Sequence, residues 1–243
     1  MKNCLTKALC DKFKNDISSH YFLTHIMSEN NVYLFGGAIR DFLDGSLDAS
    51  RDIDFVIESN TGDFVNILKY VEHLDNVTYR KNRYDGYKIT FDNCLTVDIW
   101  NLKDTWAFRN KRLEPTAENL IKSVYLNVDA LVYSLNKSVF LDNCNLKYRK
   151  TIENNFIDIV FDETPYEELN LLRALVFQKK YSLNLSLKIK NRLINYIKND
   201  LNFCIKQFIN LQMEHYNQVL IEKDEIDIIF SNLEKNYKQT ECW

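Results

Sequence analysis

The stretch that decides the fold spans residues 36–56 and reads GGAIRDFLDGSLDASRDIDFV. A short apolar run precedes its two glycines, and apolar residues at helical spacing follow them, which predicts a strand, a glycine turn and a short helix. Residues 52–58 alternate polar and apolar side chains and then become wholly apolar, as expected of a strand that enters a core from an exposed end. The stretch therefore predicts two strands connected through a glycine turn and a short helix.

Further strands and helices are expected on both sides of this stretch. β-type runs at residues 77–80, 87–91 and 95–100, together with the two earlier strands, predict a mixed sheet of about five strands, and two shorter strands are expected at 128–135 and 138–141. Apolar residues at helical spacing predict a leading helix or helix pair and a run of helices beyond Pro165. The expected fold class is α+β, with an N-terminal helical segment at 1–30, a sheet-containing head at 31–145 and a helical domain at 146–243.

The composition is that of an ordinary globular protein, with 46% hydrophobic and 27% charged residues. No apolar run approaches the roughly 20 residues that cross a bilayer, and the chain does not begin with a secretory signal. A cytoplasmic location without a membrane partner is therefore expected. The net charge of -3 gives no global attraction to nucleic acid, so a nucleic-acid site has to be a local patch. The six cysteines include no C-x-x-C pair, which favours reduced thiols over zinc ligands or disulfides.

The glycine pair is a candidate phosphate site. Gly36 and Gly37 have no Cβ, so their backbone N–H groups can approach an anion closely, and the N-terminus of the following helix favours negative charge. Arg40 lies in the first helical turn, where its guanidinium can reach the same phosphates or pair with a nearby carboxylate. The turn is therefore expected to seat a triphosphate.

Three aspartates are candidate metal ligands. Asp52 and Asp54 are one residue apart, so both side chains project from the same face of a strand, where they repel one another unless a cation lies between them. Asp98 interrupts a run that otherwise suits a buried strand. Mg²⁺ prefers oxygen ligands, and two-metal phosphoryl transfer needs a third carboxylate near the attacking hydroxyl. We expect Asp98 to be that carboxylate and to help deprotonate the hydroxyl.

These motifs together resemble the head-domain signature of the polymerase-beta nucleotidyltransferase superfamily. Residues 36–45 followed by 51–56 are similar to the class II tRNA CCA-adding enzymes and bacterial poly(A) polymerases, in which a G-G-x-V-R-D-x-L-x-G stretch precedes a D-x-D strand. Weaker similarity at residues 127–133 and 171–177 extends the resemblance over roughly residues 31–185.

The resemblance implies a nucleotidyltransferase head followed by a helical neck and body. It implies Mg²⁺-dependent transfer of a nucleoside monophosphate from a nucleoside triphosphate to an RNA 3′ end, with two Mg²⁺ ions as cofactors and tRNA or a tRNA-like RNA as partner. The catalytic and metal-holding residues are then Asp52, Asp54 and Asp98. The nucleotide-binding residues that we expect are Gly36, Gly37, Arg40, Asp41, Arg109, Arg112 and Arg173.

Several positions depart from the family pattern. Residues 123–125 read Ser-Val-Tyr where CCA-adding enzymes have the arginine pair and aspartate that hold ribose and phosphates, and the asparagine of the same motif is Asp129. The family's base-selecting E-D-P-x-R element aligns onto Glu167 and Asn170, or in another register onto residues 163–165. Neither register supplies the arginine, so base selection by the CCA mechanism is not expected.

A basic and aromatic segment follows the Asp98 strand. Its basic residues are Arg109, Lys111 and Arg112, and its aromatic residues are Trp100, Trp106 and Phe108. The segment is either a platform for phosphates and stacked bases or a solvated turn beside core aromatics. Arg173, on an apolar helix, either reaches the active site or forms an interdomain salt bridge.

Three functions are compatible with these features. The first is an enzyme that adds nucleotides to an RNA 3′ end. The second is a toxin- or defence-type nucleotidyltransferase that modifies tRNA or a protein, which the small size and the altered selector positions favour. The third is a non-catalytic nucleotide-binding module, against which the retention of all three aspartates argues.

Overall fold

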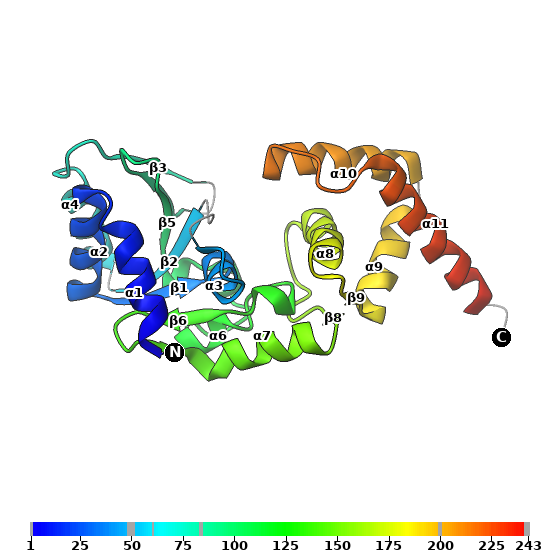
Figure 1. Ribbon diagram of the computed structural model, residues 1–243, viewed down its shortest axis with the longest axis horizontal. Helices are drawn as coiled ribbons and strands as arrows, with labels where there is room; N and C mark the ends of the chain where they lie inside the picture. The colour runs from blue at the N-terminus through cyan, green and yellow to red at the C-terminus, as the bar shows by residue number, and fades with distance from the viewer. Residues whose placement is uncertain (1, 48–51, 60, 83–84, 199–200, 241–243) are drawn as a thin grey trace. The chain divides into compact units, whose positions relative to one another are not determined.

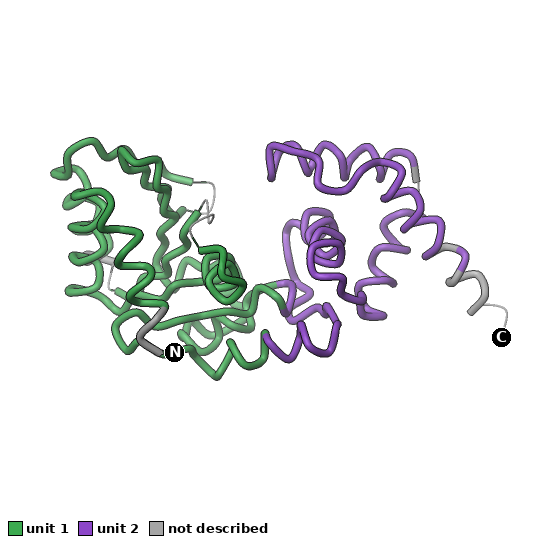
Figure 2. The backbone as a smooth tube through the Cα atoms, viewed as in Figure 1, with its two compact units in different colours: residues 1–124, 128–148 green, residues 125–127, 149–243 purple. Residues whose placement is uncertain are grey.

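The computed structural model describes residues 2–47, 52–59, 61–82, 85–198 and 201–240. The chain divides into two compact units, Met1–Val124 with Val128–Tyr148, and Tyr125–Asn127 with Arg149–Trp243 (Figure 1, Figure 2). The first unit holds a large mixed sheet and the second is mainly helical. The α+β class is confirmed, while the expected division into three domains stays a prediction.

Helices and strands follow one another along the first unit. They are α1 (Lys2–Phe13), α2 (Ile17–Glu29), β1 (Asn31–Phe35), α3 (Gly37–Leu43), β2 (Asp52–Glu58), α4 (Thr61–Val71), β3 (Thr78–Lys81), β4 (Tyr87–Thr90), β5 (Thr96–Asn101), η2 (Leu102–Asp104), α5 (Trp106–Arg109), α6 (Ala117–Leu120), η3 (Asn127–Asp129), β6 (Val132–Ser134), β7 (Val139–Phe140) and η4 (Leu141–Asn143). α7 (Cys144–Glu153) runs from the first unit into the second.

The sheet has seven strands in the order β3-β4-β5-β2-β1-β6-β7. β2 and β5 are parallel, and the other neighbouring pairs are antiparallel. The sheet is wider than the expected five strands because the short strands β6 and β7 add to its β1 edge. β6 is shorter than the predicted strand because the 3-10 turn η3 occupies the first residues of that run.

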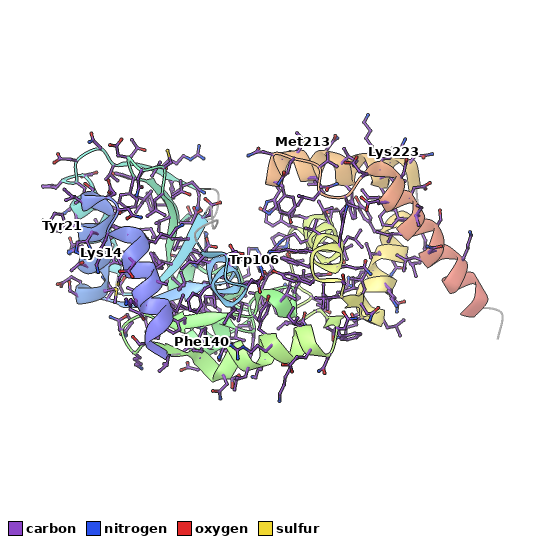
Figure 3. All side chains as sticks on the ribbon, viewed as in Figure 1. Lys14, Tyr21, Trp106, Phe140, Met213 and Lys223 are labelled. Atoms are coloured by element: carbon purple, nitrogen blue, oxygen red, sulfur yellow. The ribbon has the colours of Figure 1, made fainter. Side chains whose placement is uncertain are left out.

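The helices α1 and α2 cover one face of the sheet (Figure 1). The ring of Phe13 on α1 lies 6.0 Å from that of Phe55 on β2, and Phe22 on α2 lies 5.5 Å from Phe91 at the end of β4. Each such buried side chain stabilises the fold by about 1.5–3 kcal/mol relative to an exposed one. Tyr21, on the outer side of α2, points away from this core and is 54% exposed (Figure 3). The polar residues of β2 and β5 are consequently left for the other face.

The second unit is built from α8 (Glu167–Tyr181), α9 (Leu187–Ile197), α10 (Leu201–Tyr216) and α11 (Lys223–Thr240), with a two-stranded pair of β8 (Phe156–Ile157) and β9 (Asn184–Leu185). Gln212, fully buried on α10, accepts hydrogen bonds from the N–H groups of Leu220 and Ile221 and donates one to the Ile221 carbonyl. This side chain therefore satisfies the backbone of the loop that leads into α11. In the described part of the chain, no helix combines the length and the apolar character needed to span a bilayer.

Candidate active site

The three candidate aspartates lie on the open face of the sheet. In the parallel pairing of β2 with β5, Asp54 is directly opposite Asp98 and Asp52 is opposite Thr96. Ile53 on the intervening position is fully buried against the other face. Because side chains alternate along a strand and residues opposite one another share a face, Asp52, Asp54, Thr96 and Asp98 all project to the same side. The register of β2 with β5 thus places Asp98 on the strand beside that of Asp52 and Asp54.

A lysine lies between two of these carboxylates. Lys88, opposite Asp98 in the antiparallel pairing of β4 with β5, places its Nζ 2.8 Å from Asp52 Oδ1 and 2.9 Å from Asp98 Oδ2. The Thr96 hydroxyl donates a hydrogen bond of 2.6 Å to the same Asp52 oxygen. Asn82 Nδ2 lies 3.4 Å from the other Asp98 oxygen. Two carboxylates from neighbouring strands thus converge on one positive charge.

The ammonium of Lys88 keeps its charge in this position. Burial alone lowers the pKa of Lys88, but its hydrogen bonds to Asp52 and Asp98 and the negative charge of both carboxylates outweigh that effect and raise the pKa. Its side chain is 24% exposed, so the cluster remains in contact with solvent. A cation is therefore held at the centre of the site at neutral pH.

The donor set suits a hard metal cation. No group of three or more His, Cys, Asp or Glu side chains within the described ranges is arranged to hold a metal ion. The Lys88 ammonium nevertheless acts as a stand-in, because carboxylate oxygens from two strands already surround a single cation. Oxygen ligands of this kind are the ones that Mg²⁺ prefers. The oxygens of Asp52 and Asp98 therefore fit a metal ion at the position that the Lys88 ammonium holds, with Asp54 on the same face.

The glycine turn connects β1 to α3. Gly36 has φ +64° and ψ −119°, a backbone conformation that glycine adopts far more readily than other residues, which explains the glycine at this position. Its N–H donates to the Leu131 carbonyl at 2.9 Å. An anion at this turn therefore has to use the N–H groups of the first turn of α3. Phosphate binding by Gly36 and Gly37 stays a prediction, as does that by Asp41, whose carbonyl accepts from the N–H of Ser46 after α3.

Arg40 pairs with a carboxylate, the second of its two expected alternatives. Its Nη1 lies 2.5 Å from Asp129 Oδ1, and the two side chains are only 12% and 8% exposed. Asp129 lies at the end of η3. The pair links α3 to the segment before β6, directly behind the glycine turn.

The basic and aromatic segment is split between surface and core. Arg109 binds Asp85 at 2.6 Å, and Asp85 also binds Lys81 at 2.6 Å, so this arginine belongs to an ion-pair cluster at the turn between β3 and β4. Arg112 is exposed. Phe108 is 6% exposed and is a core residue, as the second reading of this segment proposed. Phosphate binding by the two arginines stays a prediction.

Trp100 is anchored by contacts within the first unit. Its ring lies 5.9 Å from Phe35 at an interplanar angle of 84°, and its indole N–H donates to the Thr105 hydroxyl at 3.0 Å. It lies on the same face as the carboxylates, two residues after Asp98. Phe35 in turn is opposite Asp54. These two rings therefore form an aromatic border beside the carboxylates.

The expected selector positions, Glu167 and Asn170, lie in the second unit, and each contacts another residue of that unit. Glu167 accepts a hydrogen bond of 3.1 Å from Arg192 on α9, and Asn170 donates to the Thr164 hydroxyl at 3.0 Å. Arg173 lies 3.5 Å from the Asn170 side-chain oxygen, and its guanidinium lies 5.7 Å from the centre of the Phe177 ring. Arg173 therefore contacts its own helix, and its role in nucleotide binding stays a prediction.

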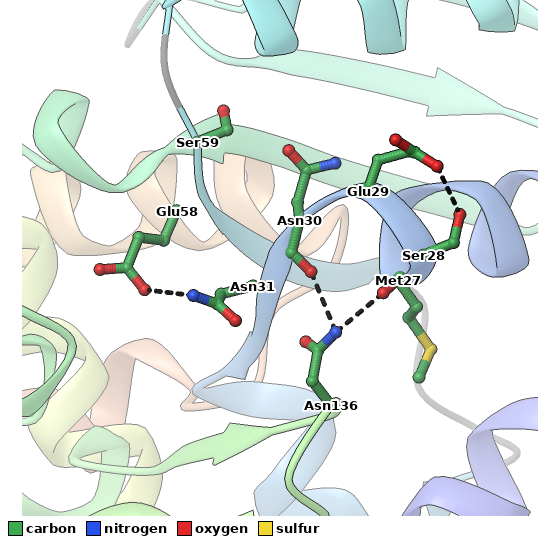
Figure 4. A pocket seen from close by; sticks show the side chains of 8 residues that line it. All are labelled: Met27, Ser28, Glu29, Asn30, Asn31, Glu58, Ser59 and Asn136. Atoms are coloured by element: carbon green, nitrogen blue, oxygen red, sulfur yellow. Dashed lines mark hydrogen bonds between the residues drawn. The ribbon is translucent and has the colours of Figure 1, made fainter.

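A polar hollow of about 610 Å³ lies at the opposite end of β2 from the aspartates (Figure 4). Its lining comes from the end of α2, the ends of β1 and β2 and the loop after β6, and consists of Met27, Ser28, Glu29, Asn30, Asn31, Glu58, Ser59 and Asn136. Glu58 accepts from Asn31, and Asn136 donates to the carbonyls of Met27 and Asn30. The two glutamates repel a triphosphate, and the lining offers no aromatic surface for a base, so the aspartate face is the better candidate site.

Lys88, Thr96 and Asn82 are the residues of this site that the sequence did not single out. A lysine in a short alternating run such as residues 87–90 is ordinarily a solvated side chain, and nothing local distinguishes it. Only the register of β4 against β5 brings Lys88 to Asp98. Pairing residues 87–90 with the Asp98 strand in the register that sets Lys88 opposite Asp98 would have identified this lysine from the sequence.

The fold is that of a nucleotidyltransferase head followed by a helical region. No protein-family model matches the sequence, and no curated protein matches it. The similarity comes from solved structures alone. Because their sequence identity to this chain is low, the similarity shows the fold and not the activity.

The fold is, more narrowly, that of the CCA-adding enzymes. A CCA-adding enzyme in complex with CTP is 15% identical, with a TM-score of 0.59, over 85% of this chain and 48% of that one. The Thermotoga maritima CCA-adding enzyme complexed with tRNA is 16% identical, with a TM-score of 0.57, over 84% of this chain and 47% of that one. A tRNA nucleotidyltransferase with a primer tRNA and an incoming ATP analogue is 17% identical, with a TM-score of 0.58, over 84% of this chain and 58% of that one. The chain thus spans about half the length of the structures it matches.

Proposed function

We propose that this chain is a Mg²⁺-dependent nucleotidyltransferase that transfers a nucleoside monophosphate from a nucleoside triphosphate to an RNA 3′ end, with tRNA or a tRNA-like RNA as acceptor. The observation that carries the proposal is the convergence of Asp52 and Asp98 on one cation, with Asp54 on the same open face. The fold supports it, because solved structures of the same fold carry CTP, an ATP analogue or tRNA in their complexes. A cytoplasmic location follows from that acceptor class.

The roles of the residues follow from their chemistry. Asp52, Asp54 and Asp98 hold two Mg²⁺ ions, which when bound neutralise phosphate charge and activate the attacking hydroxyl. Asp98, whose side chain is 18% exposed against 43% for Asp52, accepts the proton of that hydroxyl. The glycine turn and the first turn of α3 seat the triphosphate. Arg40, held by Asp129, keeps α3 and therefore this turn in place.

Nucleotide incorporation tests the proposal directly. Purified protein is incubated with Mg²⁺, each radiolabelled nucleoside triphosphate in turn, and total cellular RNA and protein. Asp52→Ala and Asp54→Ala each remove a metal ligand and are expected to lower transfer at least about 100-fold, the scale of losing a main electrostatic contact in the transition state. Asp92→Ala, at an exposed aspartate of the same unit, is the matched control and is expected to transfer normally. Near-normal transfer by either active-site variant contradicts the metal assignment.

The labelled acceptor separates the two enzymatic readings. Label on a defined RNA identifies a terminal transferase and its nucleotide, and label on protein alone identifies the toxin- or defence-type reading. Glu167 and Asn170 are engaged with Arg192 and Thr164, so we expect no ordered addition of C, C and A to a trimmed tRNA. Such ordered addition overturns that expectation.

A non-catalytic nucleotide-binding module is the second candidate function, and one contact favours it. The Lys88 ammonium occupies the position between Asp52 and Asp98 that a metal needs. Binding of a nucleoside triphosphate by calorimetry, without incorporation into RNA or protein at any Mg²⁺ or Mn²⁺ concentration, supports the module over the enzyme.

A further inference from the structure

We propose that Lys88 is a built-in counter-cation of the aspartate site, which holds Asp52 and Asp98 together in the metal-free protein and leaves that position when a divalent cation binds. The proposal deepens the proposed function and rests on it for the assignment of these aspartates as metal ligands. It adds a competition between a side chain and a metal for the same oxygens.

The geometry makes the two cations mutually exclusive. Lys88 Nζ is 2.8 Å from Asp52 Oδ1 and 2.9 Å from Asp98 Oδ2, and a Mg²⁺ ion bound to the same oxygens lies about 2.1 Å from each. Both positions fall between the same two carboxylates, so an ammonium and a divalent ion cannot occupy them together without close repulsion. Metal binding at Asp52 and Asp98 therefore requires Lys88 to leave.

The charges explain why a resident cation is useful. Asp54 and Asp98 are opposite one another on neighbouring strands, and Asp52 is two residues from Asp54 on the same face. Like charges in such positions destabilise a sheet. Lys88 supplies a positive charge between the carboxylates of Asp52 and Asp98, so the repulsion within the cluster is reduced without a metal.

The surroundings favour an exchange over a fixed ion pair. The Lys88 side chain is 24% exposed and the Asp52 side chain 43% exposed, so the ammonium has a route to water on its long flexible stem. The Thr96 hydroxyl remains hydrogen-bonded to Asp52 at 2.6 Å and Asn82 remains near Asp98 at 3.4 Å. Thr96 is thus a neutral donor to Asp52, and Asn82 is a neutral donor to the Asp98 oxygen that Lys88 does not contact. These two donors keep the carboxylates oriented when Lys88 moves.

Metal titration of the full chain tests the exchange without using catalysis as its readout. Mn²⁺ binding is measured by isothermal titration calorimetry for the wild type, Lys88→Met and Lys122→Met, and the melting temperature of each is measured in EDTA and in Mn²⁺. Met keeps the length of the stem without its charge, and Lys122, an exposed lysine of the same unit, is the matched control.

Removing the competing cation is expected to change binding and stability in opposite directions. Lys88→Met is expected to bind Mn²⁺ at least about tenfold more tightly, since the metal no longer has to break a charge-assisted pair. The same variant is expected to have a lower melting temperature than the wild type in EDTA and a larger rise in melting temperature on addition of Mn²⁺. Lys122→Met is expected to match the wild type in both Mn²⁺ affinity and melting temperature. Lys88→Arg retains the charge and is expected to bind Mn²⁺ no more tightly than the wild type.

Two results overturn the exchange. One is Mn²⁺ binding by Lys88→Met with wild-type affinity or weaker, and the other is no Mn²⁺ binding by either protein. If nucleotide transfer is found together with the first of these, the proposed function stands and the exchange fails. If Lys88→Met binds Mn²⁺ more tightly and no nucleotide is transferred, the exchange stands and the proposed function fails.

Discussion

The buried pair of Arg40 and Asp129 gives the sharpest stability prediction. Both side chains are nearly enclosed, at 12% and 8% exposure, and lie 2.5 Å apart. Asp129→Asn keeps the shape and a hydrogen-bond acceptor but leaves the Arg40 guanidinium without a negative partner at this contact. Breaking a buried pair from one side costs about 3–5 kcal/mol, and the retained acceptor places this change near the lower end, at about 3 kcal/mol.

Chemical denaturation followed by tryptophan fluorescence measures that loss. Trp100 and Trp106 lie in the first unit and Trp243 in the second, so a Trp243→Phe background makes the fluorescence report on the unit that contains the pair. Asp11→Asn is the matched control, because Asp11 pairs with Lys14 at 3.4 Å with both side chains more than half exposed, and exposed pairs contribute less than about 1 kcal/mol. The double variant Arg40→Met with Asp129→Leu is expected to be more stable than either single charge removal. A free energy of unfolding within about 1 kcal/mol of the wild type for Asp129→Asn refutes the reasoning.

Three further changes have expected outcomes that denaturation and hydrogen exchange can check. Gly36→Ala is expected to lower the free energy of unfolding by about 1–3 kcal/mol, because φ is +64° at this position. A Cβ at Gly37 meets only an ordinary contact of 3.6 Å, so Gly37→Ala is expected to leave the free energy of unfolding nearly unchanged. Equal losses at the two glycines contradict this account. Phe13→Ala is expected to cost about 3–5 kcal/mol in the free energy of unfolding, since the ring is fully buried between β2 and the end of β4. Gln212→Ala is expected to cost about 1–3 kcal/mol and to speed hydrogen exchange at Ile221, whose N–H it accepts; unchanged exchange there argues against the role of this side chain.

Much of the fold was predictable because its signals are local. The apolar run before the glycine pair forms the expected strand, Asn31–Phe35, and the run with the two aspartates forms Asp52–Glu58. Alternation along a strand is a property of the backbone, so the placement of Asp52 and Asp54 on one face needed no knowledge of the partner strands. The glycine at position 36 was likewise recognisable, because few other residues adopt its conformation.

The composition of the site depended on pairing between distant segments. Asp98 lies beside Asp54 because β5 pairs in parallel with β2, and Lys88 lies between Asp52 and Asp98 because β4 pairs with β5 in one particular register. A shift of that register by one residue turns Lys88 to the opposite face. No local pattern carries this information.

The sequence by itself determined the elements, their order and the glycine and aspartate motifs, since backbone preference and hydrophobic period act over a few residues. Only the tertiary structure decided that Arg40 pairs with Asp129 and that Lys88 occupies the centre of the aspartate cluster. These are contacts between residues far apart in the chain, set by how the sheet buries its apolar face. The charges that meet on the other face follow from that packing.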